Sequence, residues 1–355
     1  MILEGYQAAE LFFGILALAA SLLFLGKPDS IRAGKGRDIG IDFIKGVSIA
    51  AIVILHANSV ARWNLPINDF LGCFLPIFVV VSGFLLFSRY KAEVDAPQFL
   101  RKAFFRLVLP YALFTLIAHF FYYGMSVRPY DLALDLALGR MNGYNLYFIP
   151  LLIQLYLLFP LLSRFRRALF SPAGLLLIFA VSFLFSAQDI AARQASWNSN
   201  LLSLVFCGRY LLYFAFGGFM CMHRGAWNSG RKLLALAAIF AAFALAFSVF
   251  QQKIYLGFFF PIALLFLLQW CFLAAGAANA AVKAAASFGR HSLAVYLMHT
   301  VVIFNFLVLL PLALGGAGGA FILFALALSL SYIAALAFDS LYKELLARTF
   351  PQASA

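Results

Sequence analysis

Asp42, Lys45 and His56 place a carboxylate, an ammonium group and an imidazole on one otherwise apolar stretch of the chain. Asp42 and Lys45 are three residues apart and can pair across one turn of a helix. His56 follows Lys45 at a distance of about 16 Å along a helix. An imidazole exchanges protons near neutral pH and can act as a general base towards a hydroxyl. Because polar groups are costly inside a bilayer, we interpret all three residues as functional candidates.

Each of these polar residues also has a simpler explanation. Lys45 could extend to the membrane interface while Asp42 balances its charge. A lone buried histidine, such as His56, is usually a hydrogen-bonded packing group. His119 could line the same cavity as His56 or merely pack. His299 lies three residues after Tyr296 on the same helix face, which favours a structural Tyr–His pair.

The composition predicts that these residues lie in a membrane. Apolar residues make up 65% of the chain and charged residues 11%, whereas a soluble domain is about 25% charged. The apolar runs are too long for barrel strands, and lipid otherwise permits only helices. We therefore predict an all-α polytopic membrane protein with about eleven transmembrane helices, at 8–26, 41–60, 70–88, 104–124, 145–163, 173–188, 201–223, 233–250, 254–275, 292–312 and 317–339.

Basic residues predict the orientation of these helices. Most of the 26 Lys and Arg residues fall in alternate loops, which is typical of the cytoplasmic side. The start of the chain is then expected outside and its end inside. The net charge of +13 is explained by this topology, and we expect no nucleic-acid partner. We predict an additional N-terminal helix and linker at 1–36, a transmembrane core at 37–340 and a cytoplasmic tail at 341–355.

Other side chains favour packing or anion binding. The four cysteines lie in apolar runs without metal-ligand spacing, so we expect packing roles and neither a disulfide framework nor a metal site: Cys73, Cys207, Cys221 and Cys271. The Ser82-Gly83 pair predicts close helix packing, a kink or a close approach of the backbone to a ligand. Arg209, inside an apolar run, needs a cavity or a carboxylate partner. Arg101, Lys102 and Arg106 could anchor a helix at the interface or hold phosphates.

An ordered set of motifs over roughly 40 to 340 resembles the membrane-bound acyltransferase 3 family. The motifs are Asp42-Phe-Ile-Lys45 followed by ten residues and His56, Ser82-Gly83-Phe84-Leu85, Arg106-Leu-Val-Leu-Pro110-Tyr111, Asn145-Leu-Tyr147-Phe148-Ile-Pro150, Leu155-Tyr156-Leu-Leu-Phe-Pro160 and Ser292-Leu-Ala-Val-Tyr296-Leu-Met-His299. Two positions depart from the family pattern. Lys45 stands where arginine is common, and Ala103 replaces the arginine usual three residues before Arg106. The family core has ten helices, so the helix at 8–26 is additional.

The resemblance implies an enzyme of the bacterial cytoplasmic (inner) membrane that acylates envelope glycans or exported polysaccharides. The implied donor is an acyl-coenzyme A, most often acetyl-coenzyme A, with no metal. The implied catalytic residues are His56, as general base, and Asp42. The donor phosphates are expected at the cytoplasmic face near Lys45, Arg101, Lys102 and Arg106. The candidate contacts for the acceptor or the oxyanion are Asn145, Tyr147, Arg209, His119, Tyr296 and His299.

Two other functions stay open at this point. A transporter or flippase for an envelope glycan could use the same polar interior, although no inverted repeat or paired broken helices are visible in the sequence. A structural subunit of a polysaccharide-synthesis machine would leave Lys45, His56 and His299 unexplained.

Overall fold

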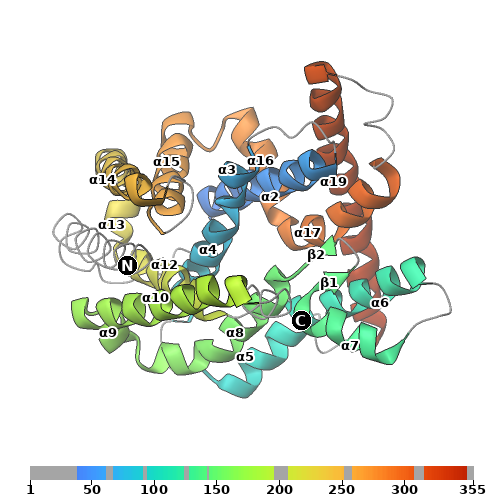
Figure 1. Ribbon diagram of the computed structural model, residues 1–355, viewed down its shortest axis with the longest axis horizontal. Helices are drawn as coiled ribbons and strands as arrows, with labels where there is room; N and C mark the ends of the chain where they lie inside the picture. Colours follow the sequence, from blue (N-terminus) through green and yellow to red (C-terminus); the bar gives the residue numbers. More distant parts are fainter. Residues whose placement is uncertain are drawn as a thin grey trace.

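The computed structural model describes residues 38–60, 67–90, 94–123, 128–141, 144–195, 207–251, 258–307 and 316–349. Figure 1 shows a bundle of helices. Four helical stretches are long and apolar enough to cross a membrane: Ile39–Val60, Asn68–Arg89, Ala96–Phe120 and Gly319–Thr349. The predicted helical membrane architecture is therefore supported, whereas the number of eleven spans stays a prediction. The expected helix at 8–26 lies outside the described residues.

The longer helices follow the predicted spans in order. They are α2 (Ile39–Val60), α4 (Phe74–Arg89), α6 (Leu109–Tyr123), α8 (Phe148–Arg164), α10 (Pro172–Ala195), α12 (Leu211–Met222), α14 (Gly230–Gln251), α15 (Phe259–Ala275), α17 (Ser292–Val301) and α19 (Gly316–Thr349). Short elements extend or connect them, namely α3 (Asn68–Gly72), α5 (Ala96–Ala103), the π-helical turn η1 (Phe104–Val108), α7 (Pro129–Leu138), α9 (Arg166–Leu169), the 3₁₀ turn η2 (Cys207–Tyr210), α13 (Arg224–Trp227), α16 (Ala280–Arg290) and the π-helical turn η3 (Val302–Leu307).

Several features differ from the predicted pattern. Helices α5, α7 and α16 lie between the predicted spans, α10 continues seven residues past its expected end at 188, and α19 continues ten residues past its expected end at 339. Strands β1 (Arg140–Met141) and β2 (Tyr144–Asn145) form a small antiparallel pair just before α8. Short polar helices escape a search for apolar runs because their stability comes from caps and from packing against neighbours.

Local sequence signals explain where the short helices begin and end. The Asp95 side chain accepts a hydrogen bond from the backbone N–H of Gln98 at the start of α5. The Asn279 side chain similarly accepts from the amides of Ala281 and Val282 at the start of α16. Such N-caps satisfy amides that have no partner within the helix. Helix α7 ends at Gly139, whose φ of 64° lies in the left-handed region that favours glycine.

Glycines allow the central helices to approach one another closely. A Cβ atom added at Gly46 of α2 would lie 1.7 Å from the Ala285 carbonyl oxygen of α16. One added at Gly289 of α16 would lie 1.8 Å from the Asp42 carbonyl oxygen. A Cβ atom added at Gly83 of α4 would lie 2.0 Å from the Phe214 carbonyl oxygen of α12. The expectation that Ser82-Gly83 marks close helix packing is therefore confirmed, since only a hydrogen fits there.

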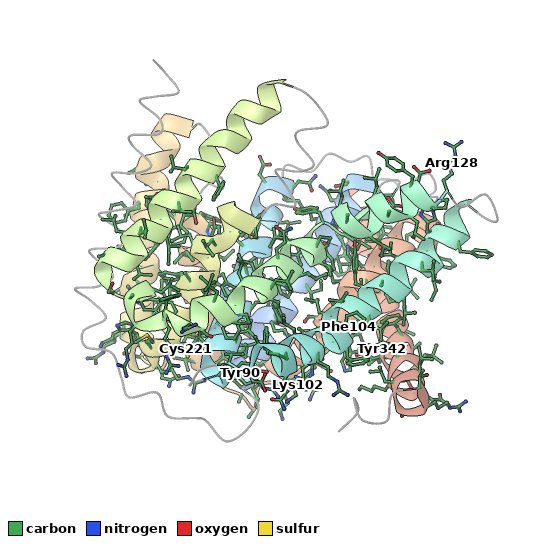
Figure 2. The ribbon with its side chains drawn as sticks, turned by 90° about the horizontal axis from the view of Figure 1, so that it is seen from below. Tyr90, Lys102, Phe104, Arg128, Cys221 and Tyr342 are labelled. Carbon is green, nitrogen blue, oxygen red and sulfur yellow. The ribbon has the colours of Figure 1, made fainter. Side chains whose placement is uncertain are left out.

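The two ends of the bundle differ in their charged side chains. Figure 2 shows Tyr90, Lys102 and Cys221 near the lower edge of the molecule and Arg128 at the opposite edge. Side chains with blue nitrogen tips gather along the lower edge in the same view. We call this end, which carries Lys102, the basic end. Its position agrees with the alternation of basic loops in the sequence.

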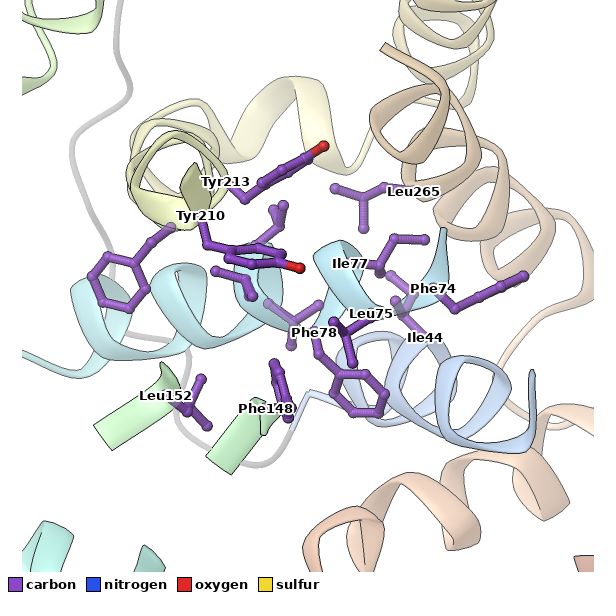
Figure 3. Packing of buried hydrophobic residues seen from close by; sticks show 14 of the residues in the cluster. Ile44, Phe74, Leu75, Ile77, Phe78, Phe148, Leu152, Tyr210, Tyr213 and Leu265 are labelled. Carbon is purple, nitrogen blue, oxygen red and sulfur yellow. The ribbon is translucent and has the colours of Figure 1, made fainter. Parts of the chain in front are cut away.

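Apolar and aromatic side chains fill the space between the helices. Phe78 of α4 and Phe148 of α8 lie side by side in Figure 3, with ring centroids 5.9 Å apart. Ile77 and Leu265 belong to the same buried cluster. Three of the cysteines, Cys73, Cys207 and Cys221, are buried, as their predicted packing roles require.

Candidate active site

The structure brings His56 of α2 and His299 of α17 together. Their ring centroids are 5.1 Å apart, and the rings are inclined by 42°. His56 is 8% exposed and His299 is fully buried. Two imidazoles in such contact disfavour simultaneous protonation, because two like charges would face one another away from water. A proton on one ring therefore disfavours a proton on the other.

The backbone of α17 fixes the orientation of His299. Its Nδ1 lies 2.6 Å from the Tyr296 carbonyl oxygen and 3.3 Å from that of Val295. A carbonyl oxygen only accepts, so Nδ1 carries the hydrogen and donates it. In the neutral ring, Nε2 then holds the lone pair, and no described residue hydrogen-bonds to this buried atom. His299 thus presents a buried acceptor, which goes beyond the simple Tyr–His pair considered from the sequence.

Tyr296 connects the histidine pair to the start of α8. Its ring lies 5.4 Å from that of His299 and meets Phe148 edge-on at 5.6 Å. The Tyr296 hydroxyl hydrogen-bonds to the Phe148 backbone, and the Tyr147 hydroxyl is near enough to interact with it electrostatically. Three predicted residues therefore meet here: His299, Tyr296 and Tyr147. The start of a helix also carries the positive end of its dipole, which favours nearby negative charge.

Asp42 and Lys45 lie close together near the start of α2. The Lys45 Nζ atom is 3.9 Å from Asp42 Oδ1. Asp42 is 6% exposed, and the Lys45 side chain is 19% exposed. Their pairing across one helical turn, predicted from the spacing, is confirmed. The Gly46–Gly289 contact holds this part of α2 against α16, so the charge pair sits on a tightly packed helix.

Arg101, Lys102 and Arg106 form a second basic group, on α5 and η1. All three side chains are exposed. The Tyr342 hydroxyl of α19 donates to the Phe105 carbonyl oxygen, which joins this segment to the C-terminal helix. Figure 1 places α5 at the lower edge of the view and α2 in its upper half. Helices α2 and α5 thus lie apart in this view, and the shared role of Lys45 and the α5 group in donor binding stays a prediction.

His119 contributes to a different contact. Its Nδ1 lies 2.8 Å from the Asp135 carboxylate of α7, and both side chains are buried. The Tyr111 hydroxyl donates to the backbone oxygens of Asp135 and Leu136, at 2.9 and 3.1 Å. These bonds fasten α7 to α6. The packing interpretation of His119 gains support from this arrangement, although its role in acceptor binding stays untested.

Two predicted residues cannot be placed by their side chains. Asn145 lies in β2, where its backbone pairs with Arg140, and Arg209 lies in η2. Their side chains fall outside the described part of the structure. The proposed acceptor contacts of both residues stay predictions.

Sequence reasoning missed two acidic partners of histidines. One is Asp135, and the other is Asp339 of α19, whose carboxylate lies 2.5 Å from His291 Nδ1. His291 directly precedes α17, so this contact ties the beginning of the helix that carries His299 to α19. The sequence feature that could have indicated these partners is the rarity of acidic residues, of which the whole chain has 13. A carboxylate within or beside an apolar run needs a partner.

Comparison with known proteins gives the chain a family. A model of the acyltransferase domain matches residues 38–336, which is most of the chain and includes all the residues of the histidine pair and the two basic groups. No curated protein and no solved structure matches the chain. The matched range includes Asp42, Lys45, His56 and His299, which the structure places in two contacts. The chain belongs to the acyltransferase 3 family and is a membrane acyltransferase.

Proposed function

We propose that this protein is an O-acyltransferase that moves an acyl group, in the first instance acetyl, from acyl-coenzyme A to a hydroxyl of an envelope glycan or exported polysaccharide. The family supports acyl transfer in a membrane. The observation that carries the mechanism is the contact between His56 and His299, 5.1 Å apart, in which the backbone orients one of the two rings.

His56 serves as the general base. It takes the proton from the acceptor hydroxyl as the hydroxyl oxygen attacks the thioester carbonyl carbon. The carbon–sulfur bond then breaks, and the departing coenzyme A thiolate receives the proton from His56. One ester bond forms, one thioester bond breaks and the proton ends on sulfur, so the step balances without an acyl-histidine intermediate.

His299 supports this proton transfer as a positioning residue. Its Nδ1–H is bound to the Tyr296 carbonyl, so Nε2 remains a proton acceptor at the edge of the pair. A neighbouring neutral imidazole stabilises the imidazolium that His56 becomes during attack, through a hydrogen bond from the protonated ring. Asp42 acts at the other end of α2, where it holds Lys45 in place.

Developing negative charge on the thioester oxygen needs fixed donors near the histidines. Tyr296 of α17, whose ring packs against His299, and Tyr147, the N-cap residue of α8, are our candidate donors. The dipole of α8 adds to their effect, since it favours negative charge at that end. Asn145, Arg209 and His119 are further candidates for contacts to the acceptor.

The donor binds from the basic end. Coenzyme A is cytosolic and polyanionic, so the basic end faces the cytosol of a bacterial inner membrane in this proposal. Arg101, Lys102 and Arg106 bind donor phosphates, and Lys45 binds an anionic group where the donor enters beside α2. The glycan arrives from the outer side, either free or from polysaccharide-synthesis machinery.

An acyl-transfer assay on purified protein tests the proposal. Wild-type protein with acetyl-coenzyme A and an envelope oligosaccharide should release free thiol and acylated sugar together. His56→Ala should lower the rate by about 10²–10⁴-fold, the usual contribution of a general base. His223→Gln is the matched control, because His223 is also buried but its Nδ1 binds the Phe219 carbonyl at another place in the bundle.

Two results would contradict the proposal. One is full activity of the His56→Ala protein. The other is a wild-type protein that transfers no acyl group but moves the glycan across vesicle membranes, which would favour the transporter.

A further inference from the structure

A cavity of about 130 Å³ lies apart from all residues assigned above to acyl transfer. Helices α4, α9 and α12 and the residue after α9 line it, through Phe87, Arg166, Arg167, Phe170, Gly218, Cys221 and Met222. Figure 2 places Cys221 near the basic end. The walls are therefore apolar except for two guanidinium groups.

Close aromatic packing shapes this cavity. The rings of Phe87 and Phe170 meet edge-on with centroids 4.9 Å apart. Both rings cover Gly218, where an added Cβ would lie 2.3 Å from Phe170 Cζ and 2.5 Å from Phe87 Cδ2. Phe87 is 3% exposed and Phe170 is 7% exposed. Rigid, buried rings of this kind keep the apolar wall in place beside the two arginines.

The guanidinium group of Arg166 lines this cavity, and its buried Nη1 nitrogen has no hydrogen-bond partner among the described residues. No ion pair in the described ranges involves Arg166 or Arg167. A guanidinium group stays charged at any physiological pH, so a buried N–H without an acceptor calls for an anion. Phosphate oxygens suit it best, because they match the fork of donors.

Exposed apolar side chains lie on the helices next to the cavity. Leu161 in the last turn of α8, Phe165 directly before α9 and Leu177 in α10 are 57%, 55% and 65% exposed. In a membrane protein, such side chains at the ends of helices face lipid. A basic pocket between helices at the cytoplasmic ends of the spans is a typical site for an anionic lipid head group.

We propose that this cavity binds the phosphodiester group of an anionic phospholipid, with Arg166 as the principal contact and Arg167 as the second. The phosphate satisfies the buried Arg166 Nη1–H, the glycerol carbons fill the space beside Phe87 and Phe170, and the acyl chains run over the exposed apolar residues of α8 and α10. The bound lipid holds the α8–α9–α10 corner against α12.

Lipid binding to purified, delipidated protein tests this proposal without any acyl-transfer assay. Thermal unfolding and native mass spectrometry are measured with phosphatidylglycerol and with phosphatidylcholine of the same chain length. Phosphatidylglycerol should bind the wild type more tightly than phosphatidylcholine and raise its unfolding temperature more, because the choline ammonium of phosphatidylcholine offsets the phosphate charge beside Arg166 and Arg167. Arg166→Gln should weaken phosphatidylglycerol binding at least about ten-fold, because it removes a charged hydrogen bond.

Arg164→Gln is the matched control, since Arg164 is an exposed arginine of the same segment that does not line the cavity. It should bind the lipid like the wild type. Equal weakening by Arg164→Gln and Arg166→Gln would overturn the proposal, as would equal binding of both lipids. Arg166-dependent stabilisation by inorganic phosphate alone would show a free-anion site, and the same effect with coenzyme A would assign the cavity to the donor. Either result would also overturn it.

Discussion

The imidazoles of His56 and His299 face one another across the contact between α2 and α17, with ring centroids 5.1 Å apart. The sequence separates these residues by most of the chain, yet the fold makes them neighbours in a nearly solvent-free position. A proton held by one ring is therefore influenced directly by the other. This relationship gives the first prediction.

Changing His299 should reduce catalysis less than changing His56, and the two effects should not add. We expect His299→Gln to lower kcat about 10- to 100-fold with little change in KM for the donor, because the residue acts through His56. The double variant His56→Ala/His299→Gln should be no slower than His56→Ala alone. The check is a double-mutant cycle on kcat/KM. Full additivity of the two changes would contradict a shared role.

Reversing the charge of Lys102 should weaken donor binding without changing the chemical step. We expect Lys102→Glu to raise KM for acyl-coenzyme A about five-fold or more at low salt, with kcat retained, because charges near the surface contribute about 1 kcal/mol each at close range. Added salt should reduce the difference. Arg128→Glu is the control, since Figure 2 shows Arg128 at the opposite end of the molecule. An equal rise in KM for both variants would argue against donor entry at the basic end.

Adding one methyl group at Gly46 should push α2 away from α16. The new Cβ would lie 1.7 Å from a backbone oxygen, so the helices must separate, and we expect Gly46→Ala to lower the free energy of unfolding by about 1–3 kcal/mol. Thermal unfolding in detergent measures the loss. Gly72→Ala provides the comparison, because its nearest neighbour would be Leu55 at 3.9 Å. If the two variants unfold at the same temperature, the close α2–α16 contact is not important for stability.

Removing the Asp135 carboxylate should loosen α7 from the bundle. We expect Asp135→Ala to destabilise the protein by about 2–4 kcal/mol, since it leaves His119 buried without its carboxylate partner. Asp135→Asn should have a smaller effect, because the amide oxygen can still accept from His119 Nδ1. Asp131→Asn, four residues earlier on α7 and only partly buried, is the matched control. Limited proteolysis of the α7 region and thermal unfolding test this, and unchanged proteolysis of Asp135→Ala would contradict it.

The sequence predicted the environment and the local structure well. A chain with 65% apolar and 11% charged residues cannot cover itself with polar surface, so helices in a membrane were the expected solution. Asp42 and Lys45 pair as their three-residue spacing predicts, because contacts within one helical turn depend only on local geometry. The ordered motifs likewise indicated the family that the comparison shows.

Only the tertiary structure decided which polar groups meet. It brings His56 into contact with His299 and pairs His119 with Asp135. Hydrophobic periodicity reports which face of a helix avoids water, but it carries no information about which distant helix covers that face. That choice depends on how whole helices fit together. Here it depends on contacts such as Gly46 against the Ala285 backbone, where there is room only for a hydrogen atom, and no local sequence pattern reveals such a contact.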